Sequence, residues 1–170
     1  MFKKLIGLAA AALVTFGFVS TAIASDADVI REARDRADID KLIWDYVQAL
    51  DNINVEAYPN FFTEDGSICC EHNHTYTGRA EIRKLLQEVK ESRDAQIAKG
   101  EKPPKMYHPI FNSHIEFRDK DHAHIDSYWF TAFADDPPNA KPRIALVGRC
   151  ADEVVRVNGK WLIKSRNVFP

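Results

Sequence analysis

The spacing of the apolar residues changes partway along this chain. Up to about residue 98, apolar side chains mostly recur every three or four positions, which is the period of an amphipathic helix. From residue 107 onward, β-branched and aromatic residues dominate, in runs separated by turn-forming residues, as is typical of strands. Helices early and strands late predict an α+β fold, in which the helices cover one face of an antiparallel sheet.

Three helices and five strands are expected. The first helix stops at Asn52, a residue that tolerates the left-handed turn after a helix, and the third begins near Arg79. The sequence Thr-Glu-Asp-Gly-Ser predicts a turn before the first strand, and Val-Asn-Gly predicts a tight hairpin between the last two strands. The first two helices are expected over residues 29–50 and 55–62, and the strands over residues 68–71, 107–117, 123–133, 143–157 and 160–169.

The chain begins with the features of a secretory signal peptide. A positively charged start, Met-Phe-Lys-Lys, precedes an apolar run that ends in Ala-Ile-Ala, a small-x-small cleavage site. The alternative is an uncleaved membrane anchor, because the apolar run is nearly long enough to span a bilayer. The polar residues Ser25 and Asp26 favour cleavage. We therefore expect a signal peptide over residues 1–24, one domain over residues 25–170, and a periplasmic or secreted protein that has no membrane contact after signal removal.

The charge of the mature domain argues against nucleic acid as a partner. Removing residues 1–24 takes away Lys3 and Lys4 and no acidic residue, so the formal net charge changes from −2 to −4. A mildly acidic domain lacks the basic surface that attracts a phosphate backbone.

Three cysteines fall in what would be an oxidising compartment. Cys69 and Cys70 are neighbours, and a bridge between them would close a strained ring. Pairing of one of them with Cys150 is favoured and would leave one free thiol. The sequence does not choose between the two.

Four segments resemble, in order and spacing, the SnoaL-like branch of the nuclear transport factor two superfamily. They begin with Ile-Asp-Lys-Leu-Ile-Trp, Tyr-Thr-Gly-Arg-Ala-Glu, Tyr-His-Pro-Ile-Phe-Asn and Gly-Arg-Cys-Ala-Asp-Glu, and they lie between Ile39 and Val168. The resemblance implies a cone-shaped fold, with a strongly curved antiparallel or mixed sheet packed on about three N-terminal helices around an apolar pocket. It also implies a homodimer or homotrimer. Members include dehydratases, isomerases, dehydrohalogenases, epoxide hydrolases and non-catalytic binding domains, so the fold alone does not fix the function.

Asp51 and His108 are candidate catalytic residues. Asp51 lies where the first predicted helix ends, and a carboxylate facing the negative end of the helix dipole costs a few tenths to about 1 kcal/mol. A solvated surface aspartate tolerates this cost and is the alternative interpretation. In dehydratase and dehydrohalogenase members, however, an acid at this helix end pairs with a histidine on a later strand. The resemblance therefore implies that Asp51 fixes the tautomer of His108 while His108 takes a proton from carbon. In the isomerase members the acid itself is the base.

The strand that carries His108 poses a problem of side-chain orientation. The alternative for His108 is a core histidine bonded to the backbone. If His108 faces a pocket, strict alternation turns Asn112 and His114 inward and sends Ile115 outward. A β-bulge near Asn112 would restore an apolar interior, so we expect one. Asn112 itself is a candidate substrate-binding residue.

Four other residues are candidates for the pocket. The resemblance to bile-acid dehydratase-like members implies that Tyr46 donates to a substrate oxygen, and core packing is the alternative. In hexachlorocyclohexane dehydrochlorinase-like members, a cation at the position of Arg166 helps to bind the leaving group. Strand parity does not decide whether Arg166 points inward, and a solvated arginine is the favoured alternative. Thr131 stands where the dehydratases have a second acid or histidine, and a threonine cannot relay a proton at neutral pH. Trp129 has the same strand parity as Thr131 and would make the pocket wall apolar.

A cysteine and histidine cluster precedes the third predicted helix. Cys70, His72 and His74 alternate and would share one face of a strand, and His122 and His124 are two more candidate ligands. We expect no metal site, because the cluster maps to an edge hairpin that faces water, and both later histidines have the parity opposite to the apolar wall.

Together these features predict an exported, cofactor-free lyase or isomerase. The Asp51–His108 pair would remove a proton from a small, largely apolar molecule. The sequence contains no phosphate-binding glycine loop, nucleophile elbow or cofactor fingerprint. The first alternative is a non-catalytic module that binds a hydrophobic ligand or mediates an interaction. A metal-binding periplasmic protein centred on residues 69–74 is the less favoured alternative.

Overall fold

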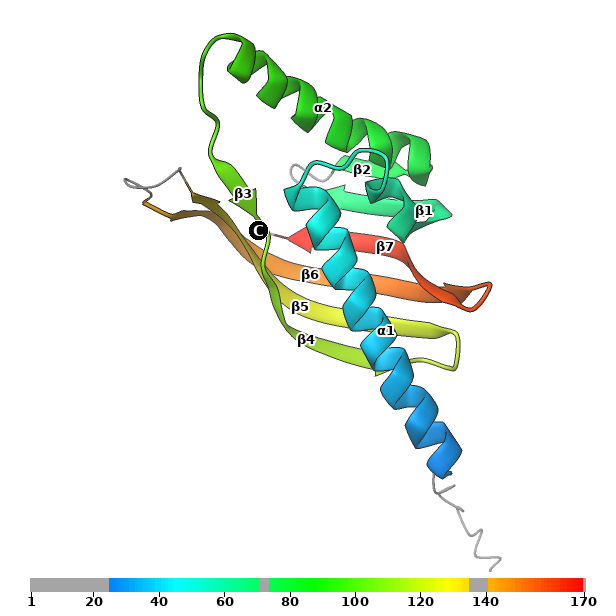
Figure 1. Ribbon diagram of the computed structural model, residues 1–170. Coiled ribbons are helices and arrows are strands. Elements are labelled where there is room, and N and C mark those ends of the chain that lie inside the picture. The colour runs from blue at the N-terminus through cyan, green and yellow to red at the C-terminus, as the bar shows by residue number, and fades with distance from the viewer. Residues whose placement is uncertain (1–24, 71–73, 135–140, 170) are drawn as a thin grey trace, which may run out of the picture.

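A curled, seven-stranded sheet and two α-helices form the described part of the chain. The computed structural model describes residues 25–70, 74–134 and 141–169. The strand order is β2-β1-β7-β6-β5-β3, with β4 also paired to β5, and only the β1–β7 pair is parallel (Figure 1). The predicted α+β architecture, a curved mixed sheet packed on helices, is confirmed. The strands are β1 (Phe62–Cys70), β2 (His74–Thr77), β3 (Lys105–Tyr107), β4 (Ile110–Phe117), β5 (His122–Ala134), β6 (Arg143–Val157) and β7 (Lys160–Phe169).

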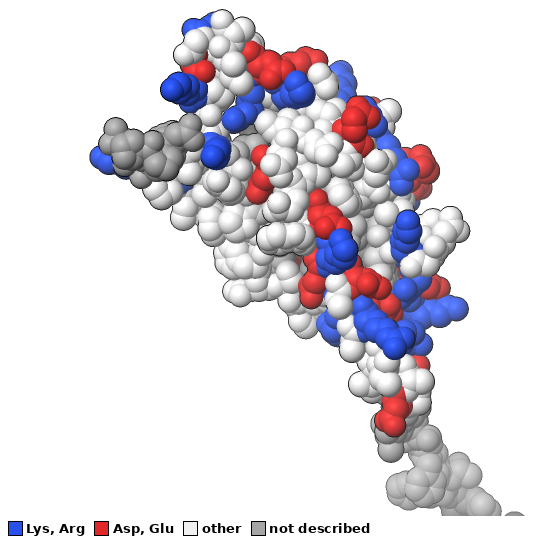
Figure 2. Space-filling view, in the orientation of Figure 1, with Lys and Arg blue, Asp and Glu red and all other residues white. Residues whose placement is uncertain are grey.

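Helix α1 (Asp26–Asp51) crosses the concave face of the sheet (Figure 1). It starts with a capping box in which the backbone N–H of Asp28 donates to the Ser25 hydroxyl over 3.2 Å. Its inner side buries Ile39 and Tyr46 against the sheet. Basic and acidic side chains are interspersed along its outer side (Figure 2), and among them Arg36 and Glu32 pair at 2.7 Å. An apolar inner side and a charged outer side are what the sequence period predicted.

Two features at the end of α1 set the position of Asp51. The helix stops at Asn52 as predicted, and the Asn52 side chain donates to the carbonyl oxygen of Gln48 over 2.7 Å. The left-handed residue is Ile53, with φ of 50°, and not Asn52, whose φ is −89°. The turn brings η1 (Tyr58–Phe61), a single 3₁₀ turn, under the helix end.

The second helix expected over residues 55–62 is shorter than predicted: only Tyr58–Phe61 is helical, as a 3₁₀ turn, and Phe62 already belongs to β1. The predicted turn over residues 63–67 is wrong, since these residues continue β1 through a shift of register against β7. A Cβ at Gly66 would lie 3.0 Å from the carbonyl oxygen of Ile163, so the two backbones approach as closely as they do only because Gly66 has no side chain. Tertiary pairing with β7 overrides the local turn preference here.

Helix α2 (Gly78–Ala98) corresponds to the third predicted helix and lies over the β1–β2 edge of the sheet (Figure 1). Ile82 and Leu86 are buried beneath it. No helix of the described residues is long and apolar enough to cross a membrane. The predicted signal peptide, residues 1–24, lies outside the described residues, so export stays a prediction.

The strand expected over residues 107–117 is interrupted. Strands β3 and β4 both pair with β5, but His108 and Pro109 separate them, because Pro109 has no N–H to donate to the ladder. The predicted bulge at Asn112 is present: φ of Asn112 is 54°, and the register shifts between Phe111 and His114. Beyond the bulge Ile115 is buried, as an apolar interior requires.

Strands β5, β6 and β7 form an antiparallel meander that makes most of the concave wall. Strands β6 and β7 have the predicted boundaries, and their hairpin turns through Asn158 and Gly159, with φ of 52° and 78°. The core between sheet and helices combines Ile39, Phe62, Ile82, Val154, Trp161 and Ile163.

Candidate functional site

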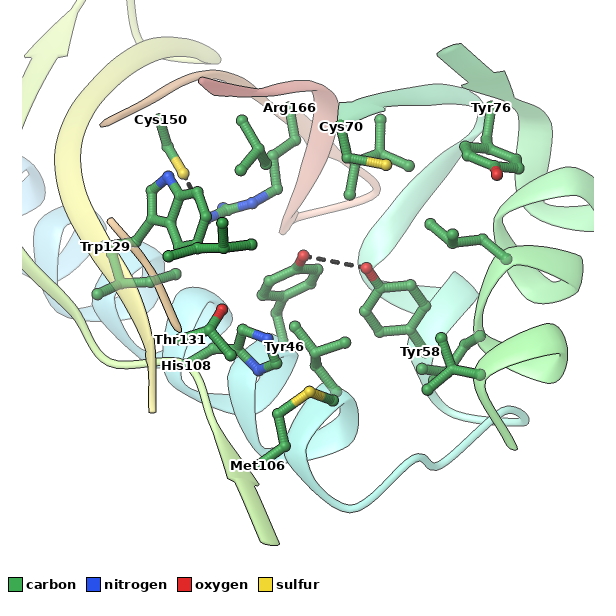
Figure 3. A pocket seen from close by; sticks show the side chains of 18 residues that line it. Tyr46, Tyr58, Cys70, Tyr76, Met106, His108, Trp129, Thr131, Cys150 and Arg166 are labelled. Atoms are coloured by element: carbon green, nitrogen blue, oxygen red, sulfur yellow. Dashed lines mark hydrogen bonds between the residues drawn. The ribbon is translucent and has the colours of Figure 1, made fainter. Parts of the chain in front are cut away.

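A cavity of about 450 Å³ lies between the concave face of the sheet, the last turns of α1 and the middle of α2 (Figure 3). Its lining is mostly apolar, and polar groups enter it from α1, η1, the β3–β4 connection and β5 to β7. Such a chamber, with few polar groups in an apolar wall, is typical of a site for a small organic molecule. The lining residues are Tyr46, Leu50, Tyr58, Ile68, Cys70, Tyr76, Leu85, Leu86, Val89, Met106, His108, Ile110, Trp129, Thr131, Leu146, Cys150, Arg166 and Val168.

Asp51 and His108 meet at the wall of this cavity. Nδ1 of His108 lies 2.8 Å from Oδ1 of Asp51, and their side chains are 17% and 13% exposed. The last residue of α1 supplies the acid, and the break between β3 and β4 supplies the imidazole. If the carboxylate accepts the Nδ1 proton, Nε2 is the unprotonated ring nitrogen, which can accept a proton. His108 is therefore not a core histidine bonded to the backbone, and Asp51 is not a solvated surface residue.

The dyad also borders a second, polar hollow. Asp51 lines this smaller space of about 270 Å³ together with Asn52 and Arg93, whereas His108 lines the large cavity. The imidazole of His108 thus faces the large apolar cavity, and the carboxylate of Asp51 faces the smaller polar hollow.

Two tyrosine hydroxyls meet in the middle of the cavity. The oxygen atoms of Tyr46 and Tyr58 are 3.0 Å apart, and Figure 3 shows them pointing at one another from α1 and η1. Both side chains are buried, and burial raises the pKa of each phenol. One hydroxyl donates its proton to the hydrogen bond between the two tyrosines. The other hydroxyl keeps a proton that is free for a hydrogen bond to a ligand oxygen.

Arg166 enters the cavity wall from β7 as a buried cation. It is 2% exposed, Nη1 donates to Oδ2 of Asp152 over 2.7 Å, and Nη2 lies 3.2 Å from Sγ of Cys150. The expectation of a solvated arginine is wrong. Burial raises the pKa of Asp152 to about 6, although the charge of Arg166 acts to lower it. Burial likewise raises the pKa of the Cys150 thiol to about 11, which keeps it protonated.

Trp129 and Thr131 both line the cavity from β5, as their parity predicted. The Trp129 indole N–H donates to the carbonyl oxygen of Arg149 over 3.3 Å, which fixes the ring in the wall. Figure 3 shows Thr131 beside His108, so a hydroxyl donor lies next to the imidazole. Asn112, by contrast, is exposed and is not among the cavity-lining residues, because the bulge turns it away. Its position does not support the predicted substrate-binding role.

Three residues of the site were missed in the sequence. Tyr58 was expected only within the predicted second helix, Cys150 only as a disulfide partner, and Asp152 not at all. Cys150, Asp152 and Val154 alternate along β6, and all three are buried. A polar residue within a buried alternation was the available signal for Asp152.

The structure does not contain the expected disulfide. Cys150 has a free thiol and is buried, so it is not joined to either of the adjacent cysteines. In the cysteine–histidine cluster, His72 lies outside the described residues. Among the residues that are described, no group of three or more His, Cys, Asp or Glu side chains is placed to hold a metal ion. His122 and His124 lie outside the cavity lining, where they pair with Asp119 and Glu153.

Comparison with known proteins identifies the architecture. A family model described as a SnoaL-like domain matches residues 31–167. A putative scytalone dehydratase from Novosphingobium aromaticivorans is 24% identical, with a TM-score of 0.66 over 82% of this chain and 86% of that one. ActVI-ORFA from Streptomyces coelicolor is 21% identical, with a TM-score of 0.68 over 81% and 95% of the two chains.

A third similar structure holds a small molecule. A protein from Catenulispora acidiphila, in complex with S-DNPA, is 21% identical, with a TM-score of 0.65 over 80% of this chain and 94% of that one. No curated protein sequence matches the chain. At these identities the structures establish the fold.

Proposed function

Because the chain belongs to the family of SnoaL-like domains, we propose that it is a cofactor-free lyase or isomerase acting on a small, largely apolar molecule. One observation carries the proposal: a histidine paired with a carboxylate at 2.8 Å opens onto an apolar cavity of about 450 Å³. A positioned imidazole of this kind serves as a general base, and such a base contributes about 10²–10⁴-fold to a rate.

The proposed step begins at Nε2 of His108. This nitrogen takes a proton from a carbon next to an electron-withdrawing group, and the electron pair of the broken C–H bond forms a new double bond. In an elimination, a leaving group departs with its own electron pair from the neighbouring carbon. In an isomerisation, the proton returns at another carbon. Asp51 holds the Nδ1 proton and stabilises the imidazolium that forms.

The tyrosine pair supplies the polar contact that orients the substrate. The hydroxyl proton that Tyr46 and Tyr58 do not share can be donated to a substrate oxygen, which gains negative charge when the C–H bond breaks. Thr131 offers a second hydroxyl near His108. The apolar wall, which includes Trp129 and Leu86, surrounds these groups with side chains of low polarity, which strengthens their electrostatic interactions.

The second candidate function is ligand binding without turnover. It is favoured by Thr131, which cannot relay a proton where the dehydratase-like members have a second acid or histidine. A chamber of the same size and polarity would then sequester a hydrophobic molecule.

The two functions can be separated in one series of experiments. Hydroxysteroids, polyketide-like aromatics and halogenated hydrocarbons are screened for an increase in Tm, and binders are then followed by NMR in D₂O for loss of C–H signal or new products. We expect His108→Gln to lower the rate about 10²–10⁴-fold and Asp51→Asn to lower it by a smaller factor.

The matched control is His124→Gln. His124 also pairs with a carboxylate, Glu153, at 2.7 Å, but it lies outside the cavity. This variant should keep the full rate. A binder that raises Tm yet shows neither exchange nor product would favour the ligand-binding function, and a reaction that is equally fast in His108→Gln would disprove the proposed base.

We also propose that the protein forms a homo-oligomer through the convex face of the sheet. Tyr128 alternates with the cavity residues Trp129 and Thr131, so it faces outward; Phe111, Val147 and Phe169 are exposed with it, by 41% to 60%. The Phe111 and Tyr128 rings stack with centroids 6.1 Å apart. Exposed apolar side chains of this size form a patch on the order of several hundred Å², which marks an interaction surface.

Charge on the same face is suited to a second copy. The side chain of Arg149, which stands opposite Tyr128, forms no ion pair among the described residues, whereas the acids Asp126 and Glu153 lie farther along the same strands. A second copy in antiparallel orientation would bring the arginine of each molecule toward the acids of the other.

A further inference from the structure

Arg166 has no role in the proposed proton transfer. Burying its charge at the cavity wall nevertheless costs free energy, so the residue requires an explanation. Taking a guanidinium out of water requires a partner, and Asp152, itself 1% exposed, is that partner at 2.7 Å. Nη2 is directed at Cys150 over 3.2 Å, and Nε is buried beyond the reach of solvent. The hydrogen bonds that Arg166 forms with other described residues thus go to Asp152 and Cys150 in the wall, and its Nε has no partner among those residues.

The open side of the guanidinium lies against Tyr46. Its central carbon is 4.6 Å from the centroid of the Tyr46 ring, and Figure 3 shows Arg166 above that ring and beside the hydroxyl pair. A cation over an aromatic face is attracted to the ring electrons. The attraction increases when the ring becomes more negative, as it does when a phenol gives its proton more fully to an acceptor.

The pKa values of the two tyrosines also indicate that Arg166 stabilises negative charge on them. Burial raises the pKa of Tyr46 and of Tyr58, and the charge of Arg166 opposes this rise in both. The guanidinium therefore favours negative charge on the hydroxyl pair, even though Asp152 balances its formal charge.

We propose that Arg166 is a positioning residue that acts through Tyr46: its cation over the ring strengthens the hydrogen bond from the Tyr46–Tyr58 pair to a ligand oxygen that carries negative charge. Asp152 holds the guanidinium in place. The proposal concerns the same cavity as the proposed function and rests on it for the role of the ligand oxygen. Phenolates and enolates should therefore bind more tightly because of Arg166, whereas the affinity for neutral molecules of similar shape should not depend on it.

Two probes that share the same nitrophenyl ring test this role. The affinities of 4-nitrophenolate and of 4-nitroanisole, its neutral methyl ether, are measured at a pH at which the phenol is ionised. The double variant Arg166→Gln/Asp152→Asn removes both charges and leaves no unpaired ion in the core. We expect it to bind the phenolate about tenfold more weakly and the ether equally well. Tyr46→Phe, which leaves the ion pair intact, should lose the same preference.

Two further variants distinguish an effect of the Arg166 charge from general damage to the fold. Arg166→Lys keeps the charge and should retain part of the preference for the phenolate. Lys164→Gln removes a cation from the same strand, where Lys164 pairs with Asp65 at the surface, and should change neither affinity. Equal weakening of both probes in the double variant would mean a structural role only. An unchanged ratio, or a wild-type protein that does not prefer the phenolate, would overturn the proposal.

The outcome is separable from that of the proposed function. His108→Gln should lower turnover about 10²–10⁴-fold and leave the ratio of the two affinities unchanged. If the protein shows no turnover but still prefers the phenolate in a way that depends on Arg166, this inference holds and the proposed lyase or isomerase activity is rejected.

Discussion

The buried pair of Arg166 and Asp152 allows a quantitative prediction about stability. The two side chains are 2% and 1% exposed, so neither charge is solvated if the other is removed. Breaking a buried pair by removing one partner costs about 3–5 kcal/mol, because the remaining charge stays in the core without compensation. We expect this loss in the free energy of unfolding for Asp152→Asn, a large part of the 5–15 kcal/mol typical of a domain.

The double variant should be far less damaged than the single one. Replacing both members of a buried pair is often close to neutral, since the cost of desolvating the two charges disappears with their attraction. Arg166→Gln/Asp152→Asn should therefore recover about 2 kcal/mol or more relative to Asp152→Asn. This coupling is the quantity that distinguishes a desolvated pair from two independent side chains.

Urea unfolding followed by circular dichroism measures the effect, with wild type, both single variants and the double variant under one set of conditions. The control is Asp45→Asn, which breaks the exposed Lys41–Asp45 pair on α1 and should cost less than about 1 kcal/mol. If Asp152→Asn costs as little as the control, or if the two single losses simply add, the pair is not desolvated and the reasoning is refuted.

Three other predictions follow from the fold. Gly66→Ala should lower the free energy of unfolding by about 1–3 kcal/mol, because the added Cβ meets the Ile163 carbonyl and the Phe62 Cβ at 3.0 Å. Urea unfolding measures the loss, with Ser67→Ala in the same strand as the control. Equal losses in the two variants would contradict the close approach of the backbones at Gly66. Burial alone would lower the pKa of His124, but Glu153 and Asp126 outweigh it and raise this pKa above 6.5. The stabilisation from His124 is thus fully present below pH 6.5 and lost as pH rises through the raised pKa. The Tm difference between wild type and His124→Gln should shrink over that range, and a constant difference would show that His124 is not stabilised as a cation. Val147→Lys places a charge on the apolar convex face and should convert an oligomer to monomer in light scattering without altering ligand binding; a wild-type monomer would refute the proposed interface.

The strands of the second half were predictable because their pattern is local. Strands β6 and β7 are rich in β-branched and aromatic residues and meet at Asn-Gly, so their boundaries and hairpin follow from adjacent residues. The bulge at Asn112 was predictable for another reason. His108 and Ile115 could face the same interior only if the alternation broke between them. The contact between Asp51 and His108, by contrast, was an implication of the family resemblance, since no local pattern joins residues so far apart.

The first strand and the buried pair could not be derived in the same way. Residues 63–67 have the composition of a turn, and β1 continues through them because Phe62 and Ser67, at the two ends of an irregular stretch, both pair with β7, nearly a hundred residues later. Arg166 appears solvated when β7 is considered alone, because its carboxylate partner lies on β6. In both cases the deciding interaction is tertiary, and it connects residues whose proximity is set by the sheet order and not by their own sequence.

The parallel pairing of β1 with β7 has a consequence for the order in which the molecule can be assembled. The chain's final strand is the inner neighbour of its first, and it carries Arg166 and Val168 into the cavity wall. Without β7, strands β1 and β6 have no strand between them, and the cavity wall lacks both of these side chains. Long-range closure of this kind is slow compared with helix formation. Pairing of β7 therefore completes the cavity wall, and a ligand that contacts Arg166 can bind only after β7 has joined the sheet.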